Sequence, residues 1–133
     1  MFERFGPASL RVLRVAEQEC RNHNHYYVGA EHLMVALLEE RDPQIISELN
    51  SCGIDVRELH ADVRRNLGAA DDRLWEGILV TPRVRKIIEL AGRYAGDAPI
   101  EPAHLLQALR AEGGSLAAEI LRRSARNTVA PPQ

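Results

Sequence analysis

The chain contains almost no lysine. Lys86 is the only one, and the other 16 basic residues are arginines. A P-loop requires a lysine directly after a glycine, because the lysine ammonium group reaches the nucleotide phosphates. Lys86 follows Arg85. The sequence therefore excludes an ordinary P-loop ATPase within this chain.

Cysteines, long apolar runs and excess charge are also scarce. Cys20 and Cys52 are too few for a disulfide scaffold, so a reducing, cytoplasmic location is expected. No apolar run is long enough to span a bilayer and the first residues show no secretory signal, so no membrane association is expected. The formal net charge of −2, from 17 basic and 19 acidic residues, argues against binding of nucleic acid.

The patterns that are present predict an all-α fold. A length of 133 residues with 45% hydrophobic residues is typical of one globular domain. Apolar residues recur at helical spacing and the alternation typical of strands is absent. Caps and prolines punctuate this pattern. Helices are predicted over residues 7–22, 28–40, 42–53 and 55–67, and again from Thr81, from Pro102 and from Leu116.

The second half of the chain repeats the first. At an offset of 75, Pro7 meets Pro82, and successive core-facing positions of the following helix match as well. At an offset of 72, His32 meets His104, with similar apolar residues behind each. The repeat predicts two copies of a four-helix unit packed with approximate two-fold symmetry.

The repeat also predicts how the chain is divided. Residues 1–67 form the first repeat, 68–80 a connector, 81–124 the second repeat and 125–133 a flexible tail. The second repeat lacks the counterpart of the fourth helix, which would leave part of its core uncovered. Two apolar residues of the connector, Trp75 and Ile78, are expected to help cover it.

Three segments resemble a known family. They are the opening MFERF, the segment HNHYYVGAEHL at residues 23–33, and Thr81-Pro82-Arg83. Together they resemble the amino-terminal repeat domain of Clp unfoldases, of the ClpC type found in Gram-positive and actinobacterial proteins. The resemblance covers residues 1–124 and implies a binding module without a motor and without a cofactor.

The resemblance implies particular partners. Domains of this family receive substrates, adaptor proteins and, in some members, arginine-phosphorylated clients, and in actinobacteria they dock cyclic-peptide antibiotics. The chain is therefore expected to be a monomer with one of these roles, either as part of a longer unfoldase or free-standing. A free-standing copy is expected to act as a decoy or regulator of a Clp protease.

The resemblance also places a ligand groove near the pseudo-two-fold axis, with an apolar floor and charged margins. The family has Phe-Thr-Pro where this chain has Val80-Thr81-Pro82, which reduces the aromatic grip on a ligand. A structural alternative is that Phe2 only seals one end of the core. The residues expected to line the groove are Phe2, Leu13, Glu17, Val80, Arg85 and Glu89.

Phosphoarginine-reading members carry a glutamate in each repeat, within the sequence Gly-Thr-Glu-His, that pairs with the ligand guanidinium. This chain has Gly29-Ala30-Glu31-His32 in the first repeat and Glu101-Pro102-Ala103-His104 in the second. Only Glu31 keeps the carboxylate, which can make a charge-assisted contact. The resemblance thus implies at most one phosphoarginine site, at Glu31.

The histidines permit an alternative from another class. His32 and His104, or the cluster Cys20-x-x-His23-x-His25, suggest a small α-helical metal-dependent hydrolase. Structural zinc sites, however, require four ligands, and the Cys20 cluster supplies three. The favoured interpretation is that His32 and His104 pack at helix starts and satisfy backbone groups, with no catalytic residue and no metal.

Overall fold

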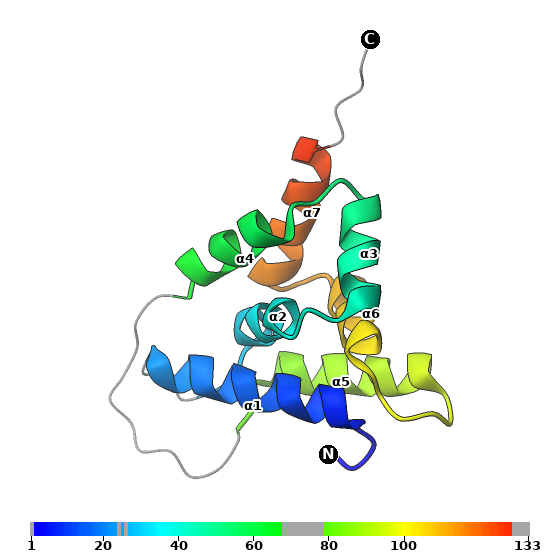
Figure 1. Ribbon diagram of the computed structural model, residues 1–133. Coiled ribbons are helices and arrows are strands. Elements are labelled where there is room, and N and C mark those ends of the chain that lie inside the picture. Colours follow the sequence, from blue (N-terminus) through cyan, green and yellow to red (C-terminus); the bar gives the residue numbers. More distant parts are fainter. Residues whose placement is uncertain (1, 24, 26, 68–78, 129–133) are drawn as a thin grey trace.

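The computed structural model describes residues 2–23, 25, 27–67 and 79–128, and within these residues the regular secondary structure consists of helices, with no named strand. The predicted all-α fold is confirmed. The predicted cover residues Trp75 and Ile78 lie outside the described residues. The helices, shown in Figure 1, are α1 (Pro7–Asn22), α2 (Ala30–Glu39), α3 (Pro43–Ser51), α4 (Val56–Arg65), α5 (Pro82–Ala95), α6 (Pro102–Glu112) and α7 (Leu116–Thr128).

Local chemistry sets where most helices begin. Asp42 and Asp55 each accept two backbone N–H groups at the starts of α3 and α4, and Thr81 accepts one at the start of α5. Prolines stand at the first helical position of α1, α3 and α5. One end differs from the prediction: α7 continues to Thr128, because no glycine or proline interrupts it before Pro131.

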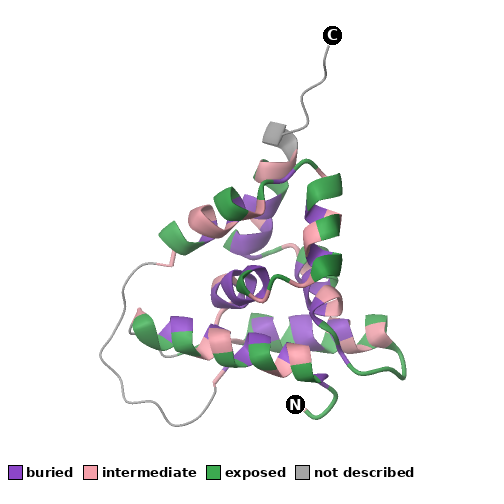
Figure 2. Cartoon of the chain, in the orientation of Figure 1, coloured by how far each residue is buried: buried purple, intermediate pink, exposed green. Residues whose placement is uncertain are grey.

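The helices form layers around one core. α1 and α5 form the base of Figure 1, where α1 packs on α2 and α5 packs on α6, and α3, α4 and α7 lie above. α2 is the most enclosed helix, with every residue from His32 to Leu38 buried (Figure 2). A helix that is apolar all round belongs in the centre of a fold, and the other helices bury only one face. None of the described helices is long and apolar enough to span a membrane.

Two short parallel bridges tie the halves together with the same geometry. In one, Ile100 N–H donates to Arg4 O (2.7 Å) and Gly6 N–H donates to Ile100 O (2.9 Å). In the other, Val28 N–H donates to Leu79 O (2.7 Å) and Thr81 N–H donates to Val28 O (3.0 Å). The two sets correspond at the offsets of 75 and 72, as the two-fold repeat predicts. Each bridge joins the start of one half to the middle of the other.

The turn after α2 differs from its counterpart after α6 in the residue that takes a left-handed conformation. Arg41 has a φ of 56°, and Gly113, at the offset of 72, has a φ of 70°. Glycine adopts this left-handed region freely, whereas a residue with a Cβ pays about 1 kcal/mol or more. The first repeat therefore carries backbone strain that the second repeat avoids.

Candidate functional site

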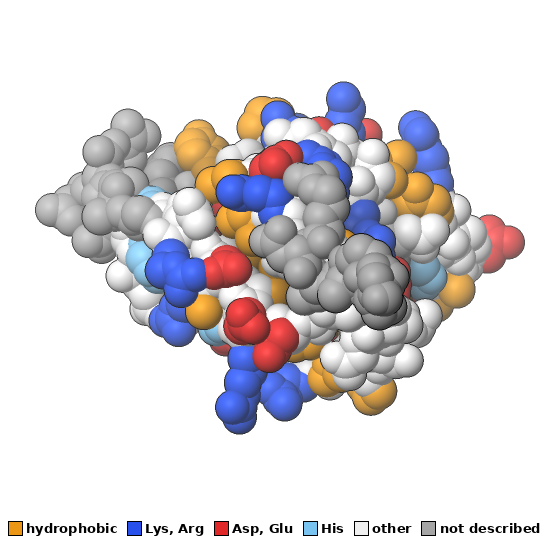
Figure 3. Space-filling view, turned by 90° about the horizontal axis from the view of Figure 1, so that it is seen from above, with side chains coloured by type: hydrophobic (Ala, Val, Ile, Leu, Met, Phe, Trp, Pro, Cys, Tyr) orange, Lys and Arg blue, Asp and Glu red, His pale blue; other side chains and the backbone are white. Residues whose placement is uncertain are grey.

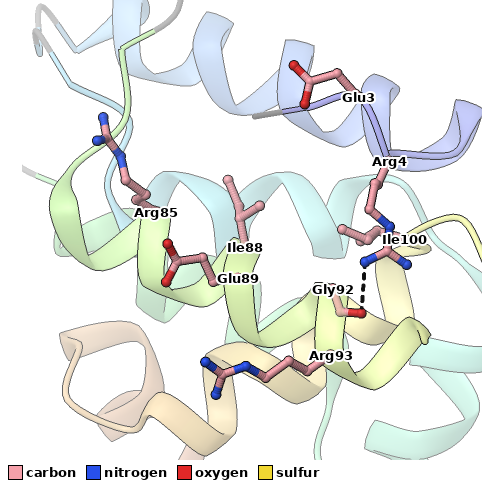
Figure 4. Close-up of a pocket in the computed structure, with 8 residues that line it drawn as sticks. All are labelled: Glu3, Arg4, Arg85, Ile88, Glu89, Gly92, Arg93 and Ile100. Atoms are coloured by element: carbon pink, nitrogen blue, oxygen red, sulfur yellow. Dashed lines mark hydrogen bonds between the residues drawn. The ribbon is translucent and has the colours of Figure 1, made fainter. Parts of the chain in front are cut away.

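A shallow pocket of about 730 Å³ opens between the segment that precedes α1 and one face of α5. Figure 4 shows the α5 side chains Arg85, Glu89 and Arg93 along one side and Glu3 with Arg4 across from them. Ile88 and Ile100, 6% and 2% exposed, form the apolar floor. The rim thus carries three guanidinium groups and two carboxylates around an apolar base.

Arg4 closes one end of the pocket by capping the C-terminus of α5. Its guanidinium donates to Gly92 O (3.0 Å), to Ala98 O (2.9 Å) and to Gly96 O. A cation at the carbonyl end of a helix is favourable because it meets unpaired carbonyls and the negative end of the helix dipole. Gly92 permits this approach, since a Cβ there would lie 3.0 Å from the Arg4 guanidinium.

Two of the six residues predicted for the groove line this pocket, Arg85 and Glu89. Phe2 is half-buried and its ring packs edge-on against Phe5, with 5.5 Å between ring centroids. Glu17 forms an ion pair of 3.0 Å with Arg21 on the same helix. Neither Phe2 nor Glu17 is among the residues that line the pocket.

Leu13 and Val80, the two remaining residues, are 4% and 7% exposed and belong to the core. Val80 pairs with Val28 as Phe5 pairs with Ile100, so Val80 holds in the second repeat the place that Phe5 holds in the first. Val80 is enclosed because its segment pairs with that of Val28, which buries both side chains. These two residues therefore pack in the core and do not face a ligand.

Sequence reasoning missed the rim residues Glu3, Arg4 and Arg93. It also missed Gly92 and the two floor residues, Ile88 and Ile100. Arg93 could have been found, because it stands two helical turns after Arg85 on the same face of α5. Arg4 carried no such signal. Its partners lie 88 or more residues away, and only the fold brings them together.

Glu31 has a structural role at the start of α7. Its Oε2 atom accepts a hydrogen bond of 2.9 Å from Ala117 N–H, while Ser115 Oγ accepts one of 3.1 Å from Ala118 N–H. α3, the counterpart of α7, begins with the carboxylate cap Asp42, and the matching position before α7 is Gly114. Glu31 therefore supplies from the first repeat the negative charge that the second repeat lacks.

Replacing Glu31 with alanine is expected to lower the free energy of unfolding by about 1 kcal/mol, the usual cost of losing a cap. Glu31→Gln should cost less, because an amide oxygen still accepts the hydrogen bond but carries no charge. Urea unfolding of the purified variants measures both values. Glu89→Ala, an exposed substitution, serves as the control. Equal stability of Glu31→Ala and the parent chain would show that the cap contributes nothing.

His32 and His104 act as reciprocal caps, which confirms the structural interpretation of these residues. His32 Nδ1 accepts from Gly29 N–H at 2.8 Å, and His104 Nδ1 accepts from Glu101 N–H at 2.9 Å. Each histidine therefore satisfies an amide at the start of its helix, in the place where a capping box has glutamate or glutamine. The assignment requires that Nδ1 be unprotonated.

His32 differs from His104 in its surroundings. It is 6% exposed, and its Nε2 lies 2.6 Å from His25 Nδ1. Burial, followed by the charges of His25 and His23, lowers the pKa of His32 from 6.5 to about 4. The neutral form that the cap requires is thus the form that the core favours.

The cysteine of this region is also unreactive. Cys20 is buried, and its Sγ donates to the carbonyls of His25 and Tyr27. Burial and the nearby Glu17 carboxylate raise the pKa of the Cys20 thiol from 9.0 to about 11, so it remains protonated. Within the described part of the chain, no three histidine, cysteine, aspartate or glutamate side chains are placed to hold a metal ion.

A family model and several curated relatives match most of this chain, and all of them are Clp proteins. A family model described as "Clp repeat (R) N-terminal domain" matches residues 4–124. The chloroplastic chaperone protein ClpC2 of Oryza sativa subsp. japonica is 32% identical over 124 residues, which cover 91% of this chain and 14% of that protein. The chloroplastic chaperone protein ClpC of Pisum sativum is also 32% identical over 124 residues, covering 91% of this chain and 13% of the relative.

A solved structure agrees in fold. The N-terminal domain of the Clp-protease-associated chaperone ClpD from Arabidopsis thaliana superposes with a TM-score of 0.70 at 22% identity, over 92% of this chain and 86% of that one. The chain spans only about one seventh of the length of the curated relatives, 14% in the case of the rice protein.

Proposed function

This chain belongs to the Clp repeat N-terminal domain family, and on that basis we propose that it is a non-catalytic module that docks polypeptides. The proposed site is the pocket between the segment that precedes α1 and the face of α5, which we name the α1–α5 pocket. In Clp ATPases a domain of this fold binds substrates and adaptors. The proposed ligands here are substrate peptides, adaptor proteins or cyclic-peptide antibiotics. The proposal includes a monomeric, cytoplasmic protein that binds no nucleic acid.

The observation that carries the proposal is the charge arrangement of the α5 face. Arg85, Glu89 and Arg93 make no ion pair with any residue in the described ranges, and all three are exposed. Ile88 and Ile100 lie between them and the segment of Arg4. An apolar floor with unpaired charges of both signs suits a peptide that offers an apolar side chain together with polar backbone groups.

The proposal also includes recognition of a phosphoarginine side chain by Glu31, with only one of its two carboxylate oxygens available to the ligand. The Oε2 atom of Glu31 is occupied by the amide of Ala117, so a ligand guanidinium would be received by Oε1. Arginine pairs best with a carboxylate when both oxygens are free. We therefore expect binding at Glu31 to be weaker than at a carboxylate that caps no helix.

The proposal is tested by calorimetric titration with a cyclic peptide that targets actinobacterial Clp unfoldases. We expect the parent chain to bind it and the double variant Arg85→Ala/Glu89→Ala to bind at least about tenfold more weakly, equivalent to about 1.4 kcal/mol. Arg14→Ala, an exposed arginine of α1, is the matched control. Phe2→Ala tests whether the aromatic ring beside the pocket contributes to the same site.

Two results would count against the proposal. Absence of binding heat with the parent chain would remove cyclic peptides as ligands, and equal affinity of the parent and the double variant would remove the α1–α5 pocket as the site. The decoy role has its own assay. A molar excess of this chain should reduce substrate degradation, or inhibitor potency, in a reconstituted Clp protease, and an unchanged rate in both would rule that role out.

A further inference from the structure

A second pocket, of about 600 Å³, lies beside α3 and the start of α4, and we name it the α3–α4 pocket. Its apolar lining consists of Ile46, Ile54 and Val56, and Arg41 and Arg57 stand at its margins. It shares no residue with the α1–α5 pocket. In Figure 1, α3 and α4 lie in the layer opposite to α1 and α5.

The two arginines of this pocket have no acidic partner among the described residues. Other arginines of the chain do, such as Arg11 with Glu40 at 2.8 Å and Arg110 with Glu48 at 2.8 Å. Figure 3, which views the molecule from the side of α3, α4 and α7, shows arginine side chains beside apolar ones on this surface. The pocket therefore presents unneutralised positive charge next to an apolar lining.

One acid among the described residues, Asp55, lines the pocket, and its single negative charge offsets the two arginines only in part. Asp55 Oδ1 accepts hydrogen bonds from Arg57 N–H at 2.9 Å and Glu58 N–H at 3.3 Å, as the N-cap of α4. The carboxylate is thus committed to the helix start. An incoming anion would meet the guanidinium groups of Arg41 and Arg57 first.

Arg41 is also held in the strained left-handed conformation described above, at a position where the second repeat has Gly113. A glycine would relieve the strain without altering the course of the turn. Strained residues concentrate at binding and catalytic sites because the side chain is needed there. The strain at Arg41 and the missing acidic partner are separate observations, and both indicate a ligand for this side chain.

We propose that the α3–α4 pocket binds an acidic polypeptide segment that carries an apolar side chain. The carboxylates of the segment would pair with Arg41 and Arg57, each of which can donate two parallel hydrogen bonds to one carboxylate. The apolar side chain would cover Ile46 and Val56, which are only half-buried. A free inorganic anion would leave this apolar surface exposed, which is why a polypeptide fits better.

Fluorescence anisotropy with a labelled decapeptide tests the proposal. The probe consists of aspartates and glutamates around two central leucines, and the comparison peptides replace the acids by their amides or the leucines by serine. We expect the acidic probe to bind, each comparison peptide to bind at least about fivefold more weakly, and the affinity to fall as salt is raised. Inorganic phosphate at ten millimolar should not displace the probe.

Three variants separate a loss of binding from a loss of folding. Arg57→Ala should weaken binding at least about fivefold. Arg41→Gly should weaken binding similarly while raising Tm by about 2–5 °C, because it removes the strain. Arg93→Ala, in the α1–α5 pocket, should bind the probe like the parent chain, so failure of the two pockets can be told apart.

Each opposite result overturns the inference. Absence of binding at one millimolar probe would do so, as would equal binding of the amide peptide or full displacement by phosphate. Unchanged affinity in Arg41→Gly and Arg57→Ala would place the bound peptide elsewhere. A loss of affinity in Arg93→Ala but not in Arg57→Ala would assign the peptide to the α1–α5 pocket, and equal losses would show that the peptide does not prefer the α3–α4 pocket.

Discussion

Replacing Ile100 with alanine should lower the free energy of unfolding by about 2–5 kcal/mol, the usual range for truncating a buried isoleucine. Ile100 is 2% exposed, and it lies where the first half of the chain meets the second. Its carbonyl accepts from Gly6 N–H at 2.9 Å and from Ser9 Oγ at 2.7 Å. The backbone on both sides is therefore held in place, which limits how far the fold can relax into the cavity.

Urea unfolding followed by circular dichroism measures this effect, and a fall in Tm of about 10 °C should accompany it. Tyr94→Ala is the control, since Tyr94 is 42% exposed on α5 and should cost little. A loss below 1 kcal/mol for Ile100→Ala would mean that neighbouring side chains fill the space. The same variant should also weaken ligand binding in the α1–α5 pocket, because Ile100 forms part of its floor.

Acidification should destabilise the chain through His32 by about 2–3 kcal/mol between pH 6.5 and pH 4. The folded chain keeps His32 neutral down to about pH 4, whereas the unfolded chain takes up the proton near the ordinary pKa of 6.5. Protons thus bind preferentially to the unfolded state in this window, so stability falls as the pH is lowered. Well above pH 6.5, His32 is neutral in both states and its contribution no longer changes.

The two repeats provide a matched pair for this experiment. Glutamine can take the place of either histidine as a capping-box acceptor without titrating in this range. His32→Gln should flatten the pH dependence of unfolding between pH 6.5 and pH 4. His104→Gln, which changes the matching cap of the second repeat, is compared under the same conditions. Identical profiles for the two variants would show that the buried environment of His32, including His25 and His23, does not cause the effect.

The fold was largely predictable because its signals are local. Asp42, Asp55 and Thr81 cap the helices that their sequences predict, and a cap needs only the next three residues. The capping role of His32 and His104 was predictable for the same reason, helped by their recurrence in both halves. The repeat then predicted the pseudo-two-fold arrangement, which the paired bridges display.

The family resemblance predicted two residues of the candidate site. Arg85 and Glu89 share a face of α5, and both line the pocket. The burial of Val80 depends on its pairing with Val28, far away in the sequence, and no local pattern announces that contact. The Glu31 cap on α7 is missed for the same reason, because a carboxylate at the start of α2 indicates a partner on α2 or in a ligand.

The bridge between Phe5 and Ile100 has a consequence for the order in which the molecule is completed during synthesis. The amides of Gly6 and Ile100 find their partners only when these two segments meet. A ribosome makes the first four helices well before it adds Ile100. During that interval the segment before α1 cannot form its hydrogen bonds with Ile100. Such distant pairing also slows folding in general. The first half should therefore reach its final form only late in translation, after Ile100 has been added.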